Sequence, residues 1–218
     1  MIYNINAETA VSAYDVTETS LSKAYALKGR IVFKAVDPIE NRNDVLFTQG
    51  STYVVYDGTT LSLTNDGGRT FTKSINVSVV GLIKNIHVFT DGTLNVFGHT
   101  KAYYSDDWTS LHEAAVYDSA GNPYVFDTYD TFTVSRHNGA IINVNGVEMY
   151  VFGNYCITDE YNQKKNIWYT TDKGHSYKSA YEFGKTMIRH VHNVYFNTTD
   201  SSFWVTTGDV DAEAYVLK

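Results

Sequence analysis

An eight-residue pattern occurs twice in this chain and constrains its fold more than any other sequence feature. The pattern reads Ser/Thr-x-Asp-x-Gly-x-Ser/Thr-aromatic, at residues 64–71 and again at residues 170–177. Its Asp can accept hydrogen bonds from backbone N–H groups a few residues later, and its Gly supplies a positive φ. Both copies therefore predict a tight turn between two β-strands. The structural residues of these turns are Thr64, Asp66, Gly68 and Phe71, then Thr170, Asp172, Gly174 and Tyr177.

Strand-like runs recur along the chain in four similar units. Their approximate bounds are residues 30–79, 80–122, 123–184 and 185–218. Thr90–Thr93 in the second unit and Asn145-Gly146 in the third lie between alternating runs and predict hairpin turns. The second unit also carries a degenerate copy of the pattern at Ser105–Trp108, which has lost the Gly. A repeat of about 40–50 residues with four short strands is typical of a β-propeller blade.

Three glycines support this register of units. Gly98, Gly153 and Gly208 each end the second strand of their unit, and both intervals between them are 55 residues. The constant spacing indicates that the second, third and fourth units repeat one arrangement of strands.

The repeated pattern resembles the Asp-box of the sialidase-like (BNR-repeat) β-propeller family, in which the box links the third and fourth strands of a blade. The resemblance implies an all-β fold, a single β-propeller domain over residues 1–218, with about four to five four-stranded antiparallel blades. It also implies that the boxes lie at the periphery of the blades, away from a ligand.

Closure of the ring is expected to involve the N-terminal segment. An open stack of blades would leave exposed strand edges, so residues 1–29 are expected to supply strands that close the last blade. Some of residues 2–14 would then pair with residues 212–217. Two alternatives remain open, that a second chain completes the ring or that the sequence is a piece of a longer protein.

Charge and hydropathy exclude several classes of partner. The chain has 17 basic and 24 acidic residues, a net charge of −7 and no basic run, so nucleic-acid binding is not expected. No apolar run approaches the ~20 residues of a membrane span, and no signal peptide is recognisable, so a soluble protein is expected. Its location is not indicated; association with a virion or a cell surface is one open alternative.

The densest polar cluster is Arg189-His190-Val191-His192, followed by Asp209 at the end of the next predicted strand. On a strand His190 and His192 share one face. The third unit has Arg136 and His137 at the matching place, and the second has Lys84 and His87.

In propellers the innermost strands line the central channel, and ligands usually lie at its mouth. The resemblance therefore implies a site for an anionic or hydroxyl-rich ligand, such as a glycan, at the channel mouth. Its expected ligand-binding residues are Arg136, His137, Arg189, His190, His192 and Asp209. The competing interpretation is a satisfied polar network between blades.

No cofactor and no metal are predicted. Cys156 is the single cysteine, so a thiolate cluster is excluded. His190 and His192 with a carboxylate have the chemistry of metal ligands, but a third fixed ligand is missing from the local sequence.

An intact sialidase site cannot be carried over to this chain. Such a site needs a Tyr nucleophile assisted by Glu, an Asp acid and three Arg for the substrate carboxylate. The N-terminal Arg-Ile-Pro motif of active sialidases is absent, since Arg30-Ile31-Val32 lacks the Pro. Asp209 is the one catalytic candidate. The favoured function is non-catalytic binding, and the alternatives are a divergent sialidase-like glycoside hydrolase and a structural or adhesion component of a phage particle or bacterial surface.

Overall fold

The structure is a computed structural model that describes residues 3–6, 32–35, 44–49, 52–66, 68–126, 132, 134–155 and 162–218. The chain divides into two units, Met1–Arg42 and Asn43–Lys218. In the first unit, β1 (Tyr3–Asn6) pairs antiparallel with β2 (Val32–Ala35). The expected pairing of residues 2–14 with residues 212–217 stays a prediction, because residues 7–31 lie outside the described residues.

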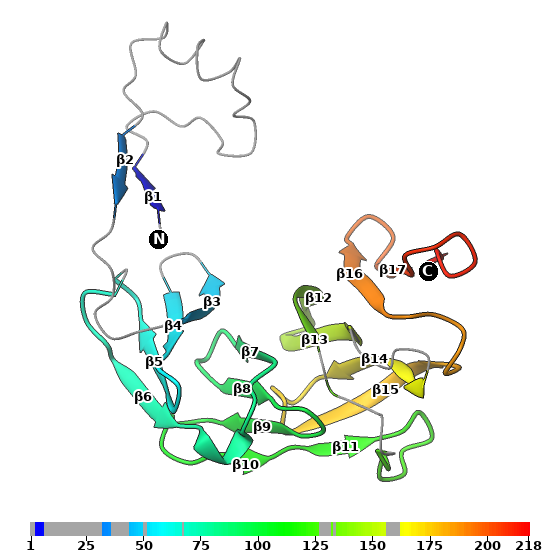
Figure 1. Ribbon diagram of the computed structural model, residues 1–218, viewed down its shortest axis with the longest axis horizontal. Helices are drawn as coiled ribbons and strands as arrows, with labels where there is room; N and C mark the ends of the chain where they lie inside the picture. The colour runs from blue at the N-terminus through cyan, green and yellow to red at the C-terminus, as the bar shows by residue number, and fades with distance from the viewer. Residues whose placement is uncertain are drawn as a thin grey trace, which may run out of the picture. The chain divides into compact units, whose positions relative to one another are not determined.

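The described part of the second unit is built of β-strands, with a turn of 3-10 helix at Ser78–Val80. Its strands form four sheets (Figure 1). The first sheet contains β3 (Asp44–Gln49), β4 (Thr52–Tyr56), β5 (Thr60–Thr64) and β6 (Lys73–Asn76). The second contains β7 (Asn85–Val88), β8 (Leu94–Phe97), β9 (Ala102–Ser105) and β10 (His112–Glu113). The third contains β12 (Val134–Val144), β13 (Val147–Asn154), β14 (Lys165–Thr170), β15 (Ser176–Phe183) and β11 (Ala115–Tyr117). The fourth contains β16 (Val191–Asn197), β17 (Ser202–Thr207) and β18 (Val216–Leu217).

Within each of these sheets, consecutive strands pair antiparallel in chain order. The exception is β11, which follows the last strand of the second sheet but pairs in parallel with β15 of the third. This strand therefore ties the second sheet to the third through backbone hydrogen bonds.

Apolar side chains fill the spaces between successive sheets. β7 and β8 are buried at every position, because the first and third sheets cover the two faces of the second. One core lies between the first and second sheets, with Val54, Leu61, Ile86 and Trp108 among its members. A second core, rich in aromatic rings, joins the second and third sheets through Phe97, Phe152, Trp168 and Tyr177. A third joins the third and fourth sheets through Val151, Ile167, Val191 and Val205.

The first strands of the sheets are neighbours of one another. β3 contacts β7, β7 contacts β12, and β12 contacts β16. The first strands of the four sheets thus lie on the same side of the second unit.

Both predicted turns form through their Asp carboxylates. Asp66 Oδ1 accepts hydrogen bonds from the backbone N–H groups of Arg69 and Thr70, both at 2.9 Å. These bonds, with the Thr70 backbone amide contributing most, lower the pKa of Asp66 to about 2. Asp172 likewise accepts from Ser176 N at 2.9 Å. The Thr that opens each turn donates to the Asp at 2.8 Å.

The degenerate copy forms a shorter turn of the same kind. Ser105 Oγ accepts from Trp108 N at 3.0 Å, and Asp107 accepts from Thr109 N at 2.8 Å. Trp108 has a φ of 66°, so it takes the left-handed conformation that Gly supplies in the other copies. Its ring lies in the core between the first and second sheets, and its Nε1 donates to Gly92 O at 2.8 Å. That burial compensates for the backbone strain at a bulky residue.

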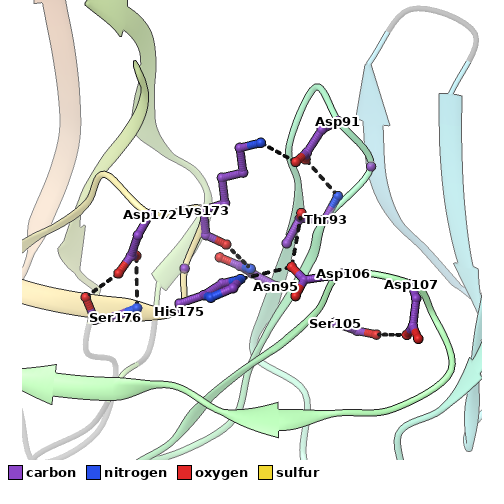
Figure 2. Close-up of polar contacts among 12 residues, drawn as sticks. Asp91, Thr93, Asn95, Ser105, Asp106, Asp107, Asp172, Lys173, His175 and Ser176 are labelled. Carbon is purple, nitrogen blue, oxygen red and sulfur yellow. Dashed lines mark hydrogen bonds and ion pairs between the residues drawn. The ribbon is translucent and has the colours of Figure 1, made fainter. Parts of the chain in front are cut away.

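The turn around Asp172 docks on the second sheet (Figure 2). Asn95 of β8 donates through Nδ2 to Lys173 O at 2.9 Å, and its Oδ1 accepts a bond from the Tyr177 hydroxyl. Lys173 pairs with Asp91, and His175 Nε2 lies 2.9 Å from Asp106 Oδ1. A network of polar contacts therefore reinforces the aromatic core between the second and third sheets.

Both predicted hairpins are confirmed. Thr90–Thr93 joins β7 to β8, with Phe89 N donating to Thr93 O at 2.9 Å. Asn145 and Gly146 join β12 to β13 with φ values of 53° and 84°, the two left-handed positions of a type I′ turn.

His87, which the sequence places at the position matching Arg136 and His137, does not present its imidazole to solvent. It is 4% exposed and stacks on Tyr150 with ring centroids 4.4 Å apart. In the described part of the chain its buried Nε2 has no hydrogen-bond partner. Alternation along β7 turns this side chain into the space between sheets, because both faces of that strand are covered.

Replacing Gly174 with Ala is expected to destabilise the protein more than replacing Gly146 with Ala. Both glycines have nearly the same φ, +83° and +84°, so both variants carry the left-handed strain of about 1–2 kcal/mol. A Cβ at Gly174 would lie 1.8 Å from Asn95 Oδ1, whereas nothing lies within 4 Å of a Cβ at Gly146. The free energy of unfolding in urea should fall by an additional ~1–3 kcal/mol for Gly174→Ala. Equal losses would contradict the docking of this turn on Asn95.

The stability of the protein is expected to fall on acidification through His87. Burial lowers the pKa of His87 from 6.5 to about 4, whereas an unfolded His titrates near 6.5. The unfolded chain therefore binds more protons in this window, and the free energy of unfolding decreases as pH falls from about 6.5 toward 4, by about 3 kcal/mol in total. His87→Phe should flatten the profile measured by urea denaturation, and His99→Ala, at an exposed position, should not. An unchanged slope in His87→Phe would exclude His87 as the cause.

Candidate functional site

The predicted polar cluster of the fourth unit forms at one end of the fourth sheet. His190 directly precedes β16, His192 lies within it, and Asp209 follows the end of β17. Pairing of Val191 with Thr207 brings these strand ends together, and Gly208 N donates to His190 O at 3.2 Å. We call Arg189, His190, His192 and Asp209 the Asp209 cluster.

A bulge at the start of β16 positions His192. The register runs from Val191 opposite Thr207 to Asn193 opposite Thr206, so His192 is the extra residue. Bulges bend a strand and re-aim its side chains, and they are over-represented beside functional sites. β12 has a larger shift between Val134 and Gly139. Both first strands are therefore irregular where their Arg and His residues lie.

Both imidazoles converge on one carboxylate oxygen. Asp209 Oδ1 lies 2.9 Å from His192 Nε2 and 3.3 Å from His190 Nε2. His192 Nε2 also lies 2.8 Å from Gly208 O. Since these neighbours accept hydrogen bonds, each Nε2 carries a hydrogen in this arrangement. Partial burial of Asp209 opposes ionisation, but His190 and His192 together hold the pKa of this carboxyl below its usual value.

Arg189, which precedes β16, and Glu213, from the loop after β17, lie beside Asp209. Arg189 Nη1 lies 3.9 Å from Asp209 Oδ2, and its Nε lies 3.8 Å from Glu213 Oε1. The Arg189 backbone N–H donates to Glu213 Oε2 at 3.0 Å. The Glu213 side chain is 8% exposed, whereas those of Arg189 and Asp209 are 33% and 42% exposed. The Asp209 carboxylate is therefore accessible to solvent, whereas the Glu213 carboxylate is buried and bonded to Arg189.

Tyr155 is a member of the site that the sequence did not indicate. It follows β13 of the third sheet, and its ring stacks on His190 with centroids 4.3 Å apart. The rings of His190 and His192 are perpendicular, with centroids 4.7 Å apart. The 55-residue spacing between Gly153 and Gly208 could have indicated Tyr155, because this spacing aligns the end of β13, which Tyr155 follows, with the end of β17.

Arg136 and His137 lie in β12, within its irregular first part. Val134 of this strand pairs with Asn154, the residue before Tyr155. The backbone thus places them at the end of the third sheet that borders the Asp209 cluster, and their side chains lie outside the described part of the structure. Their part in the site stays a prediction.

Three of the cluster's residues have the chemistry of metal ligands. One potential ligand atom from each of His190, His192 and Asp209 lies within 4.8 Å of the other two. The carboxylate that accompanies the two imidazoles is that of Asp209, supplied across the β16–β17 pair.

A hollow elsewhere in the second unit is lined by residues around β10 and β11. Lys101 and Glu113 form an ion pair at 2.7 Å on its wall, beside the rings of Tyr117, Tyr124 and Phe126. None of the six predicted ligand residues is among the residues that line it.

Comparisons with known proteins place the chain in no family. No family model matches it, and no curated protein matches it. One solved structure that it resembles is "YCF48 bound to D1 peptide", at 14% sequence identity and a TM-score of 0.40. The match covers 82% of this chain and 52% of that one, so the chain spans about half the length of that structure. Among the described residues, no helix has the length and the apolar composition of a membrane span.

Proposed function

We propose that the protein is a β-propeller of the Asp-box class that binds a glycan or a similar polar ligand at the Asp209 cluster, without cleaving it. The observation that carries this proposal is the convergence of His190, His192 and Arg189 on one part-exposed carboxylate. These groups come from the ends of neighbouring strands, where ligands bind in propellers.

The propeller itself is supported by how the sheets succeed one another. Each sheet packs its face against the next, and corresponding first strands are neighbours. In a propeller these strands are innermost and line the central channel. The turns of Asp66 and Asp172 connect third to fourth strands, β5 to β6 and β14 to β15, as in Asp-box blades. Four sheets then correspond to four blades, and closure by residues 1–29, by a second chain or by a further part of a longer protein completes the ring.

The chemistry of the cluster suits hydroxyl-rich ligands. Asp209 is a strong acceptor and Arg189 a strong donor, and both are accessible. A sugar hydroxyl both donates and accepts, so adjacent hydroxyls can bridge the two groups. Arg136 and His137, at the neighbouring strand start, extend the same surface in this proposal. An anionic sugar would add a charge-assisted bond to Arg189.

Binding without hydrolysis is favoured by the state of the carboxyl groups. Glycoside hydrolysis generally needs two carboxyls, one of them with a raised pKa so that it can act as an acid. The pKa of Asp209 is lowered instead, after the opposing effect of its partial burial. Glu213 is buried and bonded to Arg189. The cluster therefore lacks an accessible proton donor of the carboxylic type.

A glycan array followed by calorimetric titration of the best saccharide tests the proposal. His192→Ala should weaken binding at least about tenfold, since it removes a donor that positions Asp209. His112→Ala, at an exposed position of the second sheet, is the matched control and should bind normally. Blank arrays, or equal weakening in both variants, would reject the binding site.

The same protein should release no reporter from a panel of aryl glycosides. Turnover that disappears in Asp209→Asn would overturn the non-catalytic assignment and favour a divergent glycoside hydrolase.

A further inference from the structure

We propose that His190, His192 and Asp209 bind a divalent transition-metal ion, of which Zn²⁺ is the best probe. The two imidazoles supply nitrogen ligands and Asp209 a carboxylate oxygen, the donor set of many three-ligand zinc and iron sites. The site involves the same cluster as the proposed function but does not require that any glycan bind.

The spacing of the ligand atoms fits one ion. In a tetrahedral site with bonds of about 2.0–2.2 Å, ligand atoms lie about 3.3–3.5 Å apart. Asp209 Oδ1 lies 3.3 Å from His190 Nε2 and 2.9 Å from His192 Nε2. The largest separation within the triad is below 4.8 Å. Small rotations of the half-exposed His192 and Asp209 side chains would open the triad to bonding distance around an ion.

The surroundings hold the ligands as metal sites require. The His190 side chain is 7% exposed and stacked on Tyr155, so its orientation is fixed. Arg189 faces Asp209 Oδ2, leaving Oδ1 toward the imidazoles. Such an outer partner orients a ligating carboxylate. Glu213 in turn neutralises Arg189, which limits repulsion between the guanidinium and the ion.

The coordination sphere would stay open. Among the described residues the triad supplies three ligands, and Asp209 and His192 are 42% and 38% exposed. Water or a ligand oxygen would take a fourth position on the exposed side. Binding of the ion would displace the hydrogens that now lie between the Nε2 atoms and their acceptors.

Calorimetric titration of chelator-treated full-length protein with ZnCl₂, in the absence of saccharide, tests the site. The expected result is one ion per chain, with affinity reduced at least 30-fold in His192→Ala and in Asp209→Asn. The matched controls are His99→Ala and Asp211→Asn, at exposed positions, which should bind as the parent protein does. Thermal unfolding of each apo variant verifies that it is folded.

Two outcomes overturn the site: no saturable binding by the parent protein, or equal weakening in the cluster and control variants. Co²⁺ gives a second readout, since a bound tetrahedral site should produce visible absorption that His192→Ala abolishes. Zinc binding with blank saccharide arrays would reject the proposed function alone. Saccharide binding by protein that takes up no zinc would reject the metal site alone.

Discussion

The packing of each sheet against its neighbours is the interaction on which the second unit depends. β7 and β8 are buried at every position. A sheet with buried side chains on both faces is stable only where both faces are covered. The second sheet is therefore formed together with the first and third, and the polar contacts of Asn95 with Lys173 and Tyr177 can exist only once those sheets have met.

Glycines permit the close approach that this packing requires. A Cβ at Gly153 would lie 2.4 Å from Val191 Cγ1, where the third sheet meets the start of β16. One at Gly208 would lie 2.1 Å from Glu213 O, where the loop after β17 folds back. Both positions adjoin the Asp209 cluster. The regular spacing that was visible in the sequence thus marks the places where strand ends crowd together, and the cluster is assembled at these points.

Features specified by neighbouring residues could be predicted from the sequence, and features specified by distant ones could not. The Asp66 and Asp172 turns and the hairpin at Asn145-Gly146 depend on residues within a few positions, so their dipeptides and spacing were sufficient. The contact of Tyr177 with Asn95 joins residues 82 positions apart, and no local pattern indicates it. For the same reason the sequence aligned His87 with Arg136 and His137, whereas Phe47 and Tyr150 enclose its ring.

The candidate site shows the same division. Alternation along a strand predicted that His190 and His192 share one face, and both side chains meet Asp209, which the following strand end had suggested. The bulge that makes His192 an extra residue depends on pairing with β17, and Tyr155 comes from another sheet. Neither could be read from the run Arg189–His192. Bulges are not encoded by a single residue type, so the side chains at the irregular starts of β12 and β16 are the least predictable part of the site.

The Asp209 carboxylate is not needed to hold its own loop. Thr207 Oγ1 donates to Glu213 O at 2.7 Å, and Gly208 N bonds to His190 O. These backbone-directed bonds fix the loop whatever the side chain at position 209. An ion pair that solvent can reach contributes little to stability, because water screens the charges and ordering the side chains costs entropy. The contacts of the Asp209 carboxylate with two imidazoles and a guanidinium, at an accessible strand end, therefore contribute little to the stability of the fold. The binding proposals supply a reason for its geometry, namely a bound species that these groups would hold in common.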